Sequence, residues 1–322
     1  MTGSLDAPAL IDSVIDRLNA AYIFPDRAAA AAVLLRARLQ EGRYAGAVDQ
    51  ALLVRINEDL LEACADKHLR LLWYEADAAG VAPQSDDDVI ALLREMFRLE
   101  NHGVKRVERL AGNIGVIELT VVPDADSAGR VIAAAFELVQ HTSGLILDLR
   151  ATRGGAPDGV AYLQSFLFAD GDVHLSDMVE GPNGPTRQFW TSGYLPSPRY
   201  LDRPVFALVS GTTFSGGEAL AYDLQALKRA TVVGEATRGG AHPSTVVSLG
   251  DNVELRLPIA RSVSPVTGGD WEGVGVAPDI VVSAADAMDT ARRALLETFI
   301  ADSGASEAVR EEARQALESL RE

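Results

Sequence analysis

The chain has 322 residues, of which 48% are hydrophobic, so it is large and apolar enough to form a sizeable core, and an intrinsically disordered chain is excluded. Its 46 acidic and 29 basic residues give a net charge of −17, which would repel nucleic-acid phosphates and anionic membranes. The single cysteine, Cys64, excludes an intramolecular disulfide and a cysteine-rich zinc cluster.

The first residues, MTGSLDAPALIDSVIDRL, carry no basic segment and no continuous apolar run. No stretch of the chain approaches about 18 uninterrupted apolar residues. We therefore expect neither a signal peptide nor a transmembrane helix, and we expect a cytoplasmic location.

The N-terminal part of the chain has a helical pattern, because apolar residues recur at helical spacing from Ala7 to about Leu61. Pro25-Asp26 indicates a break and an N-cap at the start of the second helix. A small helical bundle over residues 1–75 is the simplest interpretation. A polar loop over residues 80–88 and a further helix over residues 89–99 are expected to follow.

After Asn101 the pattern changes to short runs rich in valine, isoleucine and leucine that alternate with helical patterns. The predicted strands are GNIGVIELTVV, LILDLR, PVFALVS and ATVVGEA, and the predicted helices are SAGRVIAAAFELVQ, GVAYLQSFLF and GGEALAYDLQALKR. Continuous apolar strands between helices indicate an α/β core over residues 76–300. Residues 248–257 alternate in polarity, which predicts a strand near a hairpin, and residues 301–322 are expected to form a solvated amphipathic helix.

Ser215 follows the predicted strand PVFALVS and a Gly/Thr turn, and it precedes a helix that opens at about Glu218. A serine at this junction has a side chain at a rigid edge, and the N–H groups of Gly216 and Gly217 at the helix N-terminus can stabilise an anion. The letters S-G-G-E also fit a capping box, in which Ser215 is only an N-cap. The motif alone leaves both interpretations open.

A second glycine-rich element is GLILDLRATRGGAPDG, a buried strand that ends in Asp148 and Arg150 and is followed by a turn with Gly154 and Gly155. The turn is either an ordinary glycine turn beside a structural Asp148–Arg150 pair, or a second source of N–H donors for an oxyanion. The two interpretations are compatible, because a tight turn exposes such N–H groups.

In this order, the two elements resemble the tail-specific, or C-terminal-processing, serine peptidase family. Within it the chain is most similar to the branch of the tricorn protease core and the modules of the interphotoreceptor retinoid-binding protein. The matching stretches are DLRATRGG, TTFSGGEALAYDLQALKRATVVGEATRGGAHP and WEGVGVAPDI, and the helical start running to DKHLRLLW also fits. The resemblance implies an α/β core similar to ClpP and crotonase, preceded by an N-terminal helical bundle. The family frequently also has a PDZ domain, but residues 70–110 offer no stretch long enough for one, so none is expected here.

A serine hydroxyl needs a base before it attacks a carbonyl. One solution in the family resembles a Ser–Lys dyad, but Gly240 stands in the place of its lysine. Lys228 is roughly 13 residues from Ser215 on the same presumed helix, about 20 Å away at about 1.5 Å per residue. A Ser–Lys dyad is therefore not expected.

The tricorn-like solution implies His68, in DKHLRL, as the base and Glu272, in WEGVGVAPD, as the carboxylate that orients it. Lys67 stands where that pattern has a serine, and its positive charge would lower the pKa of His68. Each residue also has a plain alternative: His68 as a structural hydrogen-bonding group, and Glu272 as the partner of Arg261.

His242, in RGGAHP, competes as the base because it lies nearer to Ser215 in the sequence, and it is otherwise a substrate contact or an ordinary loop residue. Trp190 and Tyr194 either line a substrate groove or hold a long loop in place. The remaining histidines match nothing in the pattern and are expected to be solvated: His102, His141 and His174.

The resemblance thus implies a serine peptidase that acts on peptides or unfolded chain ends. Ser215 would attack the carbonyl, His68 would take and return the proton, and Glu272 would orient His68. The N–H of Gly216 and one from the turn at Gly154 and Gly155 would hold the oxyanion. This chemistry requires no metal and no organic cofactor.

Two other functions stay open at this point. One is a carrier of a retinoid-like or lipid-like ligand that cleaves nothing, and the other is a hydrolase or acyl transferase that acts on a small biosynthetic substrate. The expected partner is a peptide or an unfolded protein, which would add as a strand to the edge of the core sheet. Homo-oligomerisation is left open by the sequence.

Overall fold

The computed structural model describes residues 6–73, 94–182, 184–250 and 252–320, and they form two compact units. Unit 1 consists of the described residues within three segments, Met1–Val89, Asp177–Arg187 and Gly240–Val263. Unit 2 consists of the described residues within Ile90–Ser176, Gln188–Gly239 and Ser264–Glu322. Each unit is built from segments that are far apart in the sequence. The division into residues 1–75, 76–300 and 301–322 uses continuous segments instead, and it stays a prediction.

Unit 1 begins with the three helices that the apolar spacing predicts. They are α1 (Ala7–Ala21), α2 (Pro25–Gln40) and α3 (Gln50–Cys64). Asp6 and Asp49 begin α1 and α3 by accepting backbone N–H groups of the first turn. The N-cap of α2 is Phe24, two residues before the expected Asp26, because Pro25 already has the backbone angle of a first helical residue.

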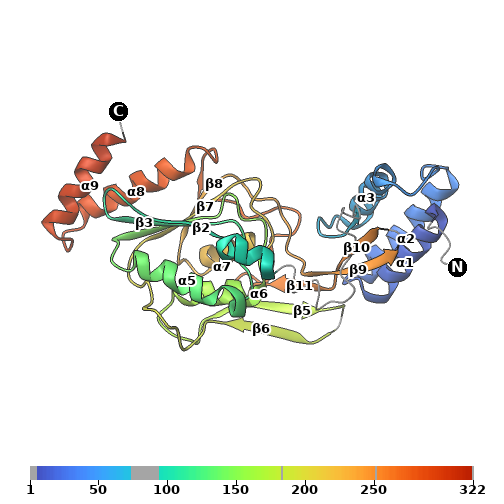
Figure 1. The fold of residues 1–322 in the computed structure, drawn as a ribbon, viewed down its shortest axis with the longest axis horizontal. Helices are drawn as coiled ribbons and strands as arrows, with labels where there is room; N and C mark the ends of the chain where they lie inside the picture. The colour runs from blue at the N-terminus through green and yellow to red at the C-terminus, as the bar shows by residue number, and fades with distance from the viewer. Residues whose placement is uncertain (1–5, 74–93, 183, 251, 321–322) are drawn as a thin grey trace. The chain divides into compact units, whose positions relative to one another are not determined.

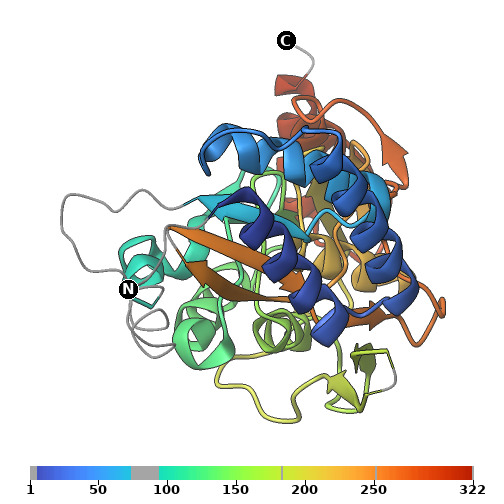
Figure 2. The same ribbon diagram turned by 90° about the vertical axis from the view of Figure 1, so that its right-hand side faces the viewer.

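A three-stranded antiparallel sheet completes unit 1, with the strand order β1-β10-β9. The strands are β1 (Arg70–Trp73), β9 (Ser244–Gly250) and β10 (Val253–Pro258). A hairpin is present as predicted, but residues 248–257, predicted as one strand, are divided between β9 and β10. Leu71 pairs with Leu255, and both belong to the core that the three helices form. Figure 2 shows α1 in dark blue beside the orange strands β9 and β10.

Unit 2 is built on a six-stranded sheet with the order β12-β8-β7-β4-β3-β2 (Figure 1). The strands are β2 (Val104–Leu110), β3 (Ile114–Leu119), β4 (Gly144–Asp148), β7 (Val205–Val209), β8 (Thr231–Gly234) and β12 (Ile280–Val281). All neighbours are parallel except β2 and β3. The central strands β4 and β7 are completely buried, as continuous apolar runs require, and the predicted α/β core is confirmed.

Helices cover both faces of this sheet. Their bounds are α5 (Ala125–Val139), α6 (Pro157–Ser165), α7 (Gly216–Ala226), α8 (Ala287–Ala301) and α9 (Glu307–Ser319), and a short 3-10 helix, η1, spans Asn101–Gly103. Figure 1 shows α5, α6 and α7 on one side of the sheet and α8 on the other. Alternate residues of the strands, such as Val116, Ile146 and Leu208, pack with α8 and α9. Ala313 and Ala316 of α9 are buried in that core, so this helix is amphipathic but not fully solvated.

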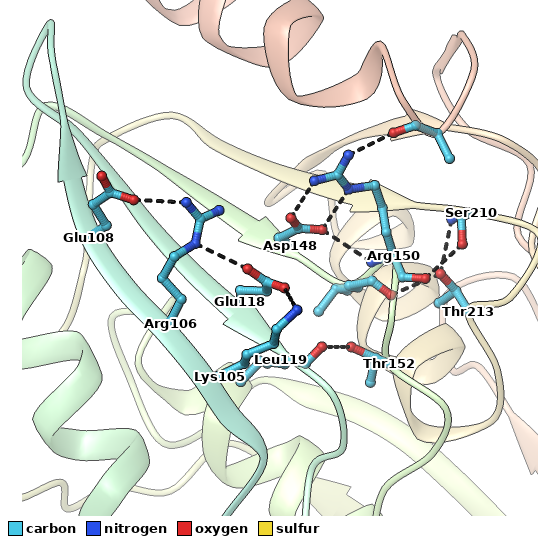
Figure 3. Close-up of polar contacts among 12 residues, drawn as sticks. Lys105, Arg106, Glu108, Glu118, Leu119, Asp148, Arg150, Thr152, Ser210 and Thr213 are labelled. Atoms are coloured by element: carbon cyan, nitrogen blue, oxygen red, sulfur yellow. Dashed lines mark hydrogen bonds and ion pairs between the residues drawn. The ribbon is translucent and has the colours of Figure 1, made fainter. Parts of the chain in front are cut away.

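The edge strand β2 carries charged side chains, which Figure 3 shows beside β3. Glu118 of β3 accepts from Lys105 Nζ at 2.7 Å and from Arg106 Nε at 3.1 Å, and Arg106 also pairs with Glu108. Charged side chains on an edge strand disfavour the addition of another strand. A peptide that adds to a sheet of this protein is therefore better placed elsewhere than on β2.

A third sheet has the strand order β11-β5-β6, with β5 (His174–Glu180), β6 (Thr186–Trp190) and β11 (Ala260–Val263). Strands β5 and β6 carry the chain from one unit into the other. The predicted loop over residues 80–88, part of the predicted helix over 89–99, and part of the region expected to lack a PDZ domain lie outside the described residues. Among the described residues, we find no helix with the length and apolar character that a bilayer-spanning helix needs.

Candidate active site

Ser215 lies where the buried strand β7 turns into α7, as the sequence predicts. Its backbone has φ 55° and ψ −118°, outside the regions that a residue with a side chain normally occupies. Strained residues of this kind persist only when their surroundings hold them, and they are concentrated at functional sites. The junction therefore needs an explanation beyond that of an ordinary helix start.

The carboxylate of Glu218 fixes this junction through hydrogen bonds. Its side chain is completely buried, and one oxygen accepts the backbone N–H of Ser215 at 2.8 Å. The other oxygen accepts from Thr237 Oγ1 at 2.5 Å and from the N–H of Gly239 at 2.6 Å. The sequence predicts only the capping bond to Ser215, whereas the carboxylate also ties the loop at residues 237–239 to the serine turn.

Two hydroxyl groups fix the turn before Ser215 to the end of β4 (Figure 3). Thr213 Oγ1 donates to the carbonyl oxygen of Leu149 at 2.9 Å and accepts the N–H of Ser210 at 3.0 Å. Ser210 Oγ donates to the carbonyl oxygen of Arg150 at 2.7 Å. The loops that follow β4 and β7, which carry the two glycine motifs, are thus bonded to each other.

The Asp148–Arg150 pair is structural, as one of the two sequence interpretations holds. The guanidinium makes two hydrogen bonds to the carboxylate, of 2.8 and 2.6 Å, and a third of 2.7 Å to the carbonyl oxygen of Ala284. The bonds to Asp148 raise the pKa of Arg150. In the same loop, Thr152 Oγ1 donates to the carbonyl oxygen of Leu119, which fixes the start of the glycine turn to β3.

The two glycine turns approach each other closely in unit 2. A Cβ atom on Gly216 would lie 2.5 Å from the nitrogen and 2.6 Å from the Cα atom of Gly155, so only glycine fits there. The same Cβ atom would lie 3.0 Å from the carbonyl carbon of Gly154, whose oxygen accepts the N–H of Val122. The structure thus brings together the backbones of the three glycines predicted to form an oxyanion hole.

Glu272 belongs to a loop that is fastened to the same region of unit 2. The ring of the preceding Trp271 lies 5.2 Å from the ring of Tyr222 on α7, and the N–H of Gly273 donates to the carbonyl oxygen of Gly239 at 3.3 Å. Because Gly239 is also held by Glu218, a chain of hydrogen bonds runs from the Ser215 turn to the neighbour of Glu272.

His68 lies in unit 1, in the connection from α3 to β1, and only 4% of it is exposed. Burial lowers its pKa to about 4, because the charged imidazolium loses hydration. Asp66 opposes this shift, and the charges of Arg256, His242 and Arg70 reinforce it. The lowered pKa of His68 agrees with the sequence prediction, but its main cause is burial and not the charge of Lys67.

Asp66 and His242 form a buried pair beside His68 that the sequence did not reveal. His242 Nδ1 lies 2.8 Å from Asp66 Oδ2, and both side chains are almost completely buried. Burial acts to raise the pKa of Asp66, but the hydrogen bond and charge of His242 and the N–H of His68 together lower it. The only signal in the sequence is the spacing D-x-H at residues 66–68.

The remaining candidates occupy distinct surroundings. Trp190 is 45% exposed, and its ring stacks on that of His174 with centroids 4.4 Å apart, so His174 is half-buried and not simply solvated. Helix α7 ends at Ala226, two residues before Lys228, so the helix is slightly shorter than the sequence indicates. That no Ser–Lys dyad forms stays a prediction.

Unit 2 therefore contains one group of predicted site residues and unit 1 the other. Unit 2 holds Ser215, Gly216, Gly154, Gly155, Glu272 and Trp190, and unit 1 holds His68, His242 and Lys67. Within either unit taken by itself, the described residues include no three histidine, cysteine or acidic side chains placed to hold a metal ion.

Comparison with known families agrees with this arrangement. The family model for peptidase family S41 matches residues 113–282, and that for the N-terminal domain of peptidase S41 in eukaryotic IRBP matches residues 4–108. The chain belongs to peptidase family S41. The predicted resemblance is thereby confirmed, including the helical N-terminal region.

The S41 chain is also similar to curated proteases. It is 30% identical over 200 residues to the carboxy-terminal-processing protease of Bartonella bacilliformis, covering 60% of this chain and 43% of that protein. It is 31% identical over 215 residues to the chloroplastic carboxyl-terminal-processing peptidase 2 of Arabidopsis thaliana, covering 64% and 40%. The chain thus spans less than half the length of these relatives.

Solved structures support the same fold. A photosystem II D1 C-terminal processing protease aligns with a TM-score of 0.56 at 17% identity, covering 87% of this chain and 94% of that one. A peptidase structure from Parabacteroides merdae aligns with a TM-score of 0.60 at 18% identity, covering 89% and 93%. The predicted fold class, an α/β core preceded by a helical region, is confirmed.

Proposed function

We propose that this chain is a serine peptidase that hydrolyses peptide bonds in peptides or unfolded chain ends. The observation that carries the proposal is the strained Ser215 at the start of α7, next to Gly216 and against the backbone of Gly155. N–H groups at such a position can stabilise the oxyanion of an acyl-transfer reaction. Membership of family S41 and the names of the curated relatives support the same reaction.

In the proposed mechanism, Ser215 Oγ attacks the carbonyl carbon, and His68 takes its proton and later gives it to the leaving amine. Glu272 would orient the His68 imidazole and stabilise its charged form. The N–H of Gly216 and one from Gly154 or Gly155 would bind the oxyanion. Trp190, Lys67 and His242 are proposed to act around the substrate, with His242 as the alternative base.

The tricorn-like arrangement of serine, histidine and glutamate, the peptide or unfolded-protein substrate, and a cytoplasmic location are parts of this proposal. The net charge of −17 supports substrates other than nucleic acids and partners other than anionic membranes. The carrier of an apolar ligand is not favoured, because the named relatives are processing proteases. A hydrolase or acyl transferase that acts on small substrates is the other alternative. Labelling of Ser215 without turnover of any peptide in the library would favour it over the peptidase.

The test is labelling with a fluorophosphonate, followed by mass spectrometry and by assays on a peptide library. We expect one adduct, on Ser215, and turnover that falls by at least about 10³-fold in Ser215→Ala. The variant keeps the bond that the Ser215 N–H donates to Glu218, but it loses the side-chain half of the capping box. A cost of about 0.5–2 kcal/mol of stability is therefore expected whether or not Ser215 is the nucleophile, and unchanged turnover would show that Ser215 is only an N-cap.

A further inference from the structure

Asp66 is a buried carboxylate that the proposed mechanism does not use. It is the second residue after α3, where Ala65 has a left-handed backbone with φ 49°, and it begins the short connection that carries His68 to β1. None of its surface is exposed. A buried carboxylate is costly unless it is fully hydrogen-bonded, so its partners indicate what it holds in place.

The partners of Asp66 come from three separate parts of unit 1. Oδ1 accepts the backbone N–H of His68 at 3.0 Å, which closes a turn two residues long. Oδ2 accepts from the hydroxyl of Tyr22, at the end of α1, at 3.1 Å and from His242 Nδ1 at 2.8 Å. One carboxylate thus joins the α1–α2 connection, the α3–β1 connection and the segment before β9.

The pair fixes the protonation pattern of His242. An ionised carboxylate can only accept hydrogen bonds, so Nδ1 of His242 must carry the proton it donates. The ring of Phe24 packs edge-on against the imidazole, with centroids 5.2 Å apart, and this contact restrains its rotation. The position of His242 therefore depends on Asp66, as does that of the His68 backbone.

Unit 1 offers a matched comparison in Asp59 of α3. Asp59 is also buried, and it accepts from the Tyr44 hydroxyl at 2.6 Å and from Arg43 Nε at 2.9 Å. Its partners include no candidate base. Both aspartates are buried and accept from a tyrosine hydroxyl, but Asp59 is otherwise paired with arginine, whereas Asp66 holds the backbone of His68 and the imidazole of His242.

We propose that Asp66 is a positioning residue for the catalytic base, which holds the backbone of His68 with one oxygen and the imidazole of His242 with the other. This inference rests on the proposed function, because it assigns Asp66 a part in presenting His68 for proton transfer. The base is carried by a connection without regular structure, so its position must come from bonds such as these. Misplacement of a catalytic group by about 1 Å can lower a rate by about 100-fold.

The first test compares Asp66→Asn with Asp59→Asn. Both variants replace a buried charged acceptor by an amide, and both should lower the melting temperature. We expect Asp66→Asn to lower kcat by about 100-fold with KM within about 3-fold, and Asp59→Asn to leave both constants within about 3-fold. Equal effects of the two variants on kcat would overturn the proposal, because stability alone would then explain them.

A second test applies if Asp66→Asn fails to fold. Tyr22→Phe removes the hydroxyl that donates to Asp66 Oδ2 and leaves the other partners of Asp66 in place, whereas Tyr44→Phe removes the corresponding donor to Asp59. We expect Tyr22→Phe to lower kcat by at least about 5-fold with KM within about 3-fold, and Tyr44→Phe to leave both constants within about 3-fold. Equal effects of these two variants on kcat would overturn the positioning role.

A measurement that needs no turnover separates this inference from the proposed function. In the NMR spectrum of the wild type, the Nδ1–H proton of His242 should appear at the low field typical of an imidazole bound to a carboxylate, and the amide of His68 should exchange slowly. The His242 signature should be lost in Asp66→Asn, which has no carboxylate, and both signatures should be kept in Asp59→Asn. Their absence from the wild type overturns the inference, whereas their presence in a protein that fluorophosphonate does not label overturns only the proposed function.

Discussion

At the scale of the residue, burial shifts the pKa of two groups in opposite directions. It lowers the pKa of His68 to about 4 and raises the pKa of Asp223 to about 7. The cause is the same, because burial disfavours the charged form, which is the protonated form of an imidazole and the deprotonated form of a carboxyl group. His68 is a candidate base, whereas Asp223 lies on α7 and contacts Gln164 of α6.

The first prediction concerns the pH dependence of activity. A base with a pKa of about 4 stays neutral, and able to take a proton, at a lower pH than an ordinary histidine. We expect kcat/KM to stay constant from about pH 7 down to about pH 5 and to halve near pH 4, with circular dichroism as the control for folding. An acid limb near pH 6.5, the usual pKa of histidine, would contradict His68 as the buried base.

The second prediction concerns Asp223 and stability. Its pKa is about 7 when folded and about 4 when unfolded, so between these values the folded state binds the extra proton and stability falls as the pH rises. Asp223→Asn removes this dependence and keeps an amide that can bond to Gln164. Between pH 5 and pH 8, the free energy of unfolding of the wild type should fall relative to that of the variant by on the order of 2 kcal/mol. The free energies are measured by urea unfolding. If wild type and variant differed by the same amount at pH 5 and at pH 8, the prediction would be wrong.

At the scale of the element, the turn from β7 to α7 depends on a single buried side chain. Glu218 accepts three hydrogen bonds, from the Ser215 turn and from the loop at Thr237 and Gly239. Those bonds hold Ser215 in its positive-φ backbone conformation and fasten α7 to the loop at residues 237–239, whose Gly239 carbonyl oxygen accepts the N–H of Gly273. The start of α7 is therefore fixed by a capping side chain that also bonds to residues about 20 positions later in the chain.

The third prediction is that Glu218→Gln weakens this junction. Glutamine has one acceptor oxygen, and its amide group would face an N–H or O–H donor, so at least one buried bond is lost. We expect a cost of about 1–3 kcal/mol in chemical unfolding and slower labelling of Ser215 by a fluorophosphonate. The matched control is Glu137→Gln on the exposed side of α5, which should change neither quantity. If Ser215 were labelled at the same rate in Glu218→Gln, the helix cap would not contribute to the reactivity of the serine.

At the scale of the whole molecule, the chain folds into units that do not follow the order of the sequence. The core of unit 1 combines the helices α1, α2 and α3 with Val253, Leu255 and Leu257 of β10. Strand β1 has β10 as its partner, about 180 residues later in the chain. The N-terminal helices therefore depend on residues that are synthesised much later.

The fourth prediction follows from this arrangement. Leu255 is completely buried between β1 and β9, so Leu255→Ala should cost about 2–5 kcal/mol and should speed hydrogen exchange in α1, α2 and α3. Val246→Ala on β9, where the side chain is 43% exposed, should change stability by less than about 0.5 kcal/mol. Unchanged exchange in the helices of Leu255→Ala would mean that β10 does not support them.

The elements that a local pattern specifies were predictable from the sequence. The helical spacing predicts α1 to α3, the apolar runs predict β3, β4, β7 and β8, and the glycine motifs place Ser215 and Gly155 at strand ends. Strands β5, β6 and β11 were not predicted, because their half-exposed residues follow no clear alternation. A period of two or of 3.6 residues reports burial on one face, and where that burial is incomplete the signal is lost.

Only the tertiary structure shows which segments meet. The pairing of Arg70–Trp73 with Val253–Pro258 and the bond between Asp66 and His242 join residues that no local pattern connects. The same holds for the contact of Gly216 with Gly155, which requires two loops to pass at a distance that only glycine allows. Periodicity and motif spacing act over a few residues, whereas these contacts are set by the packing of the complete core, so the sequence determined the parts and the tertiary structure decided their partners.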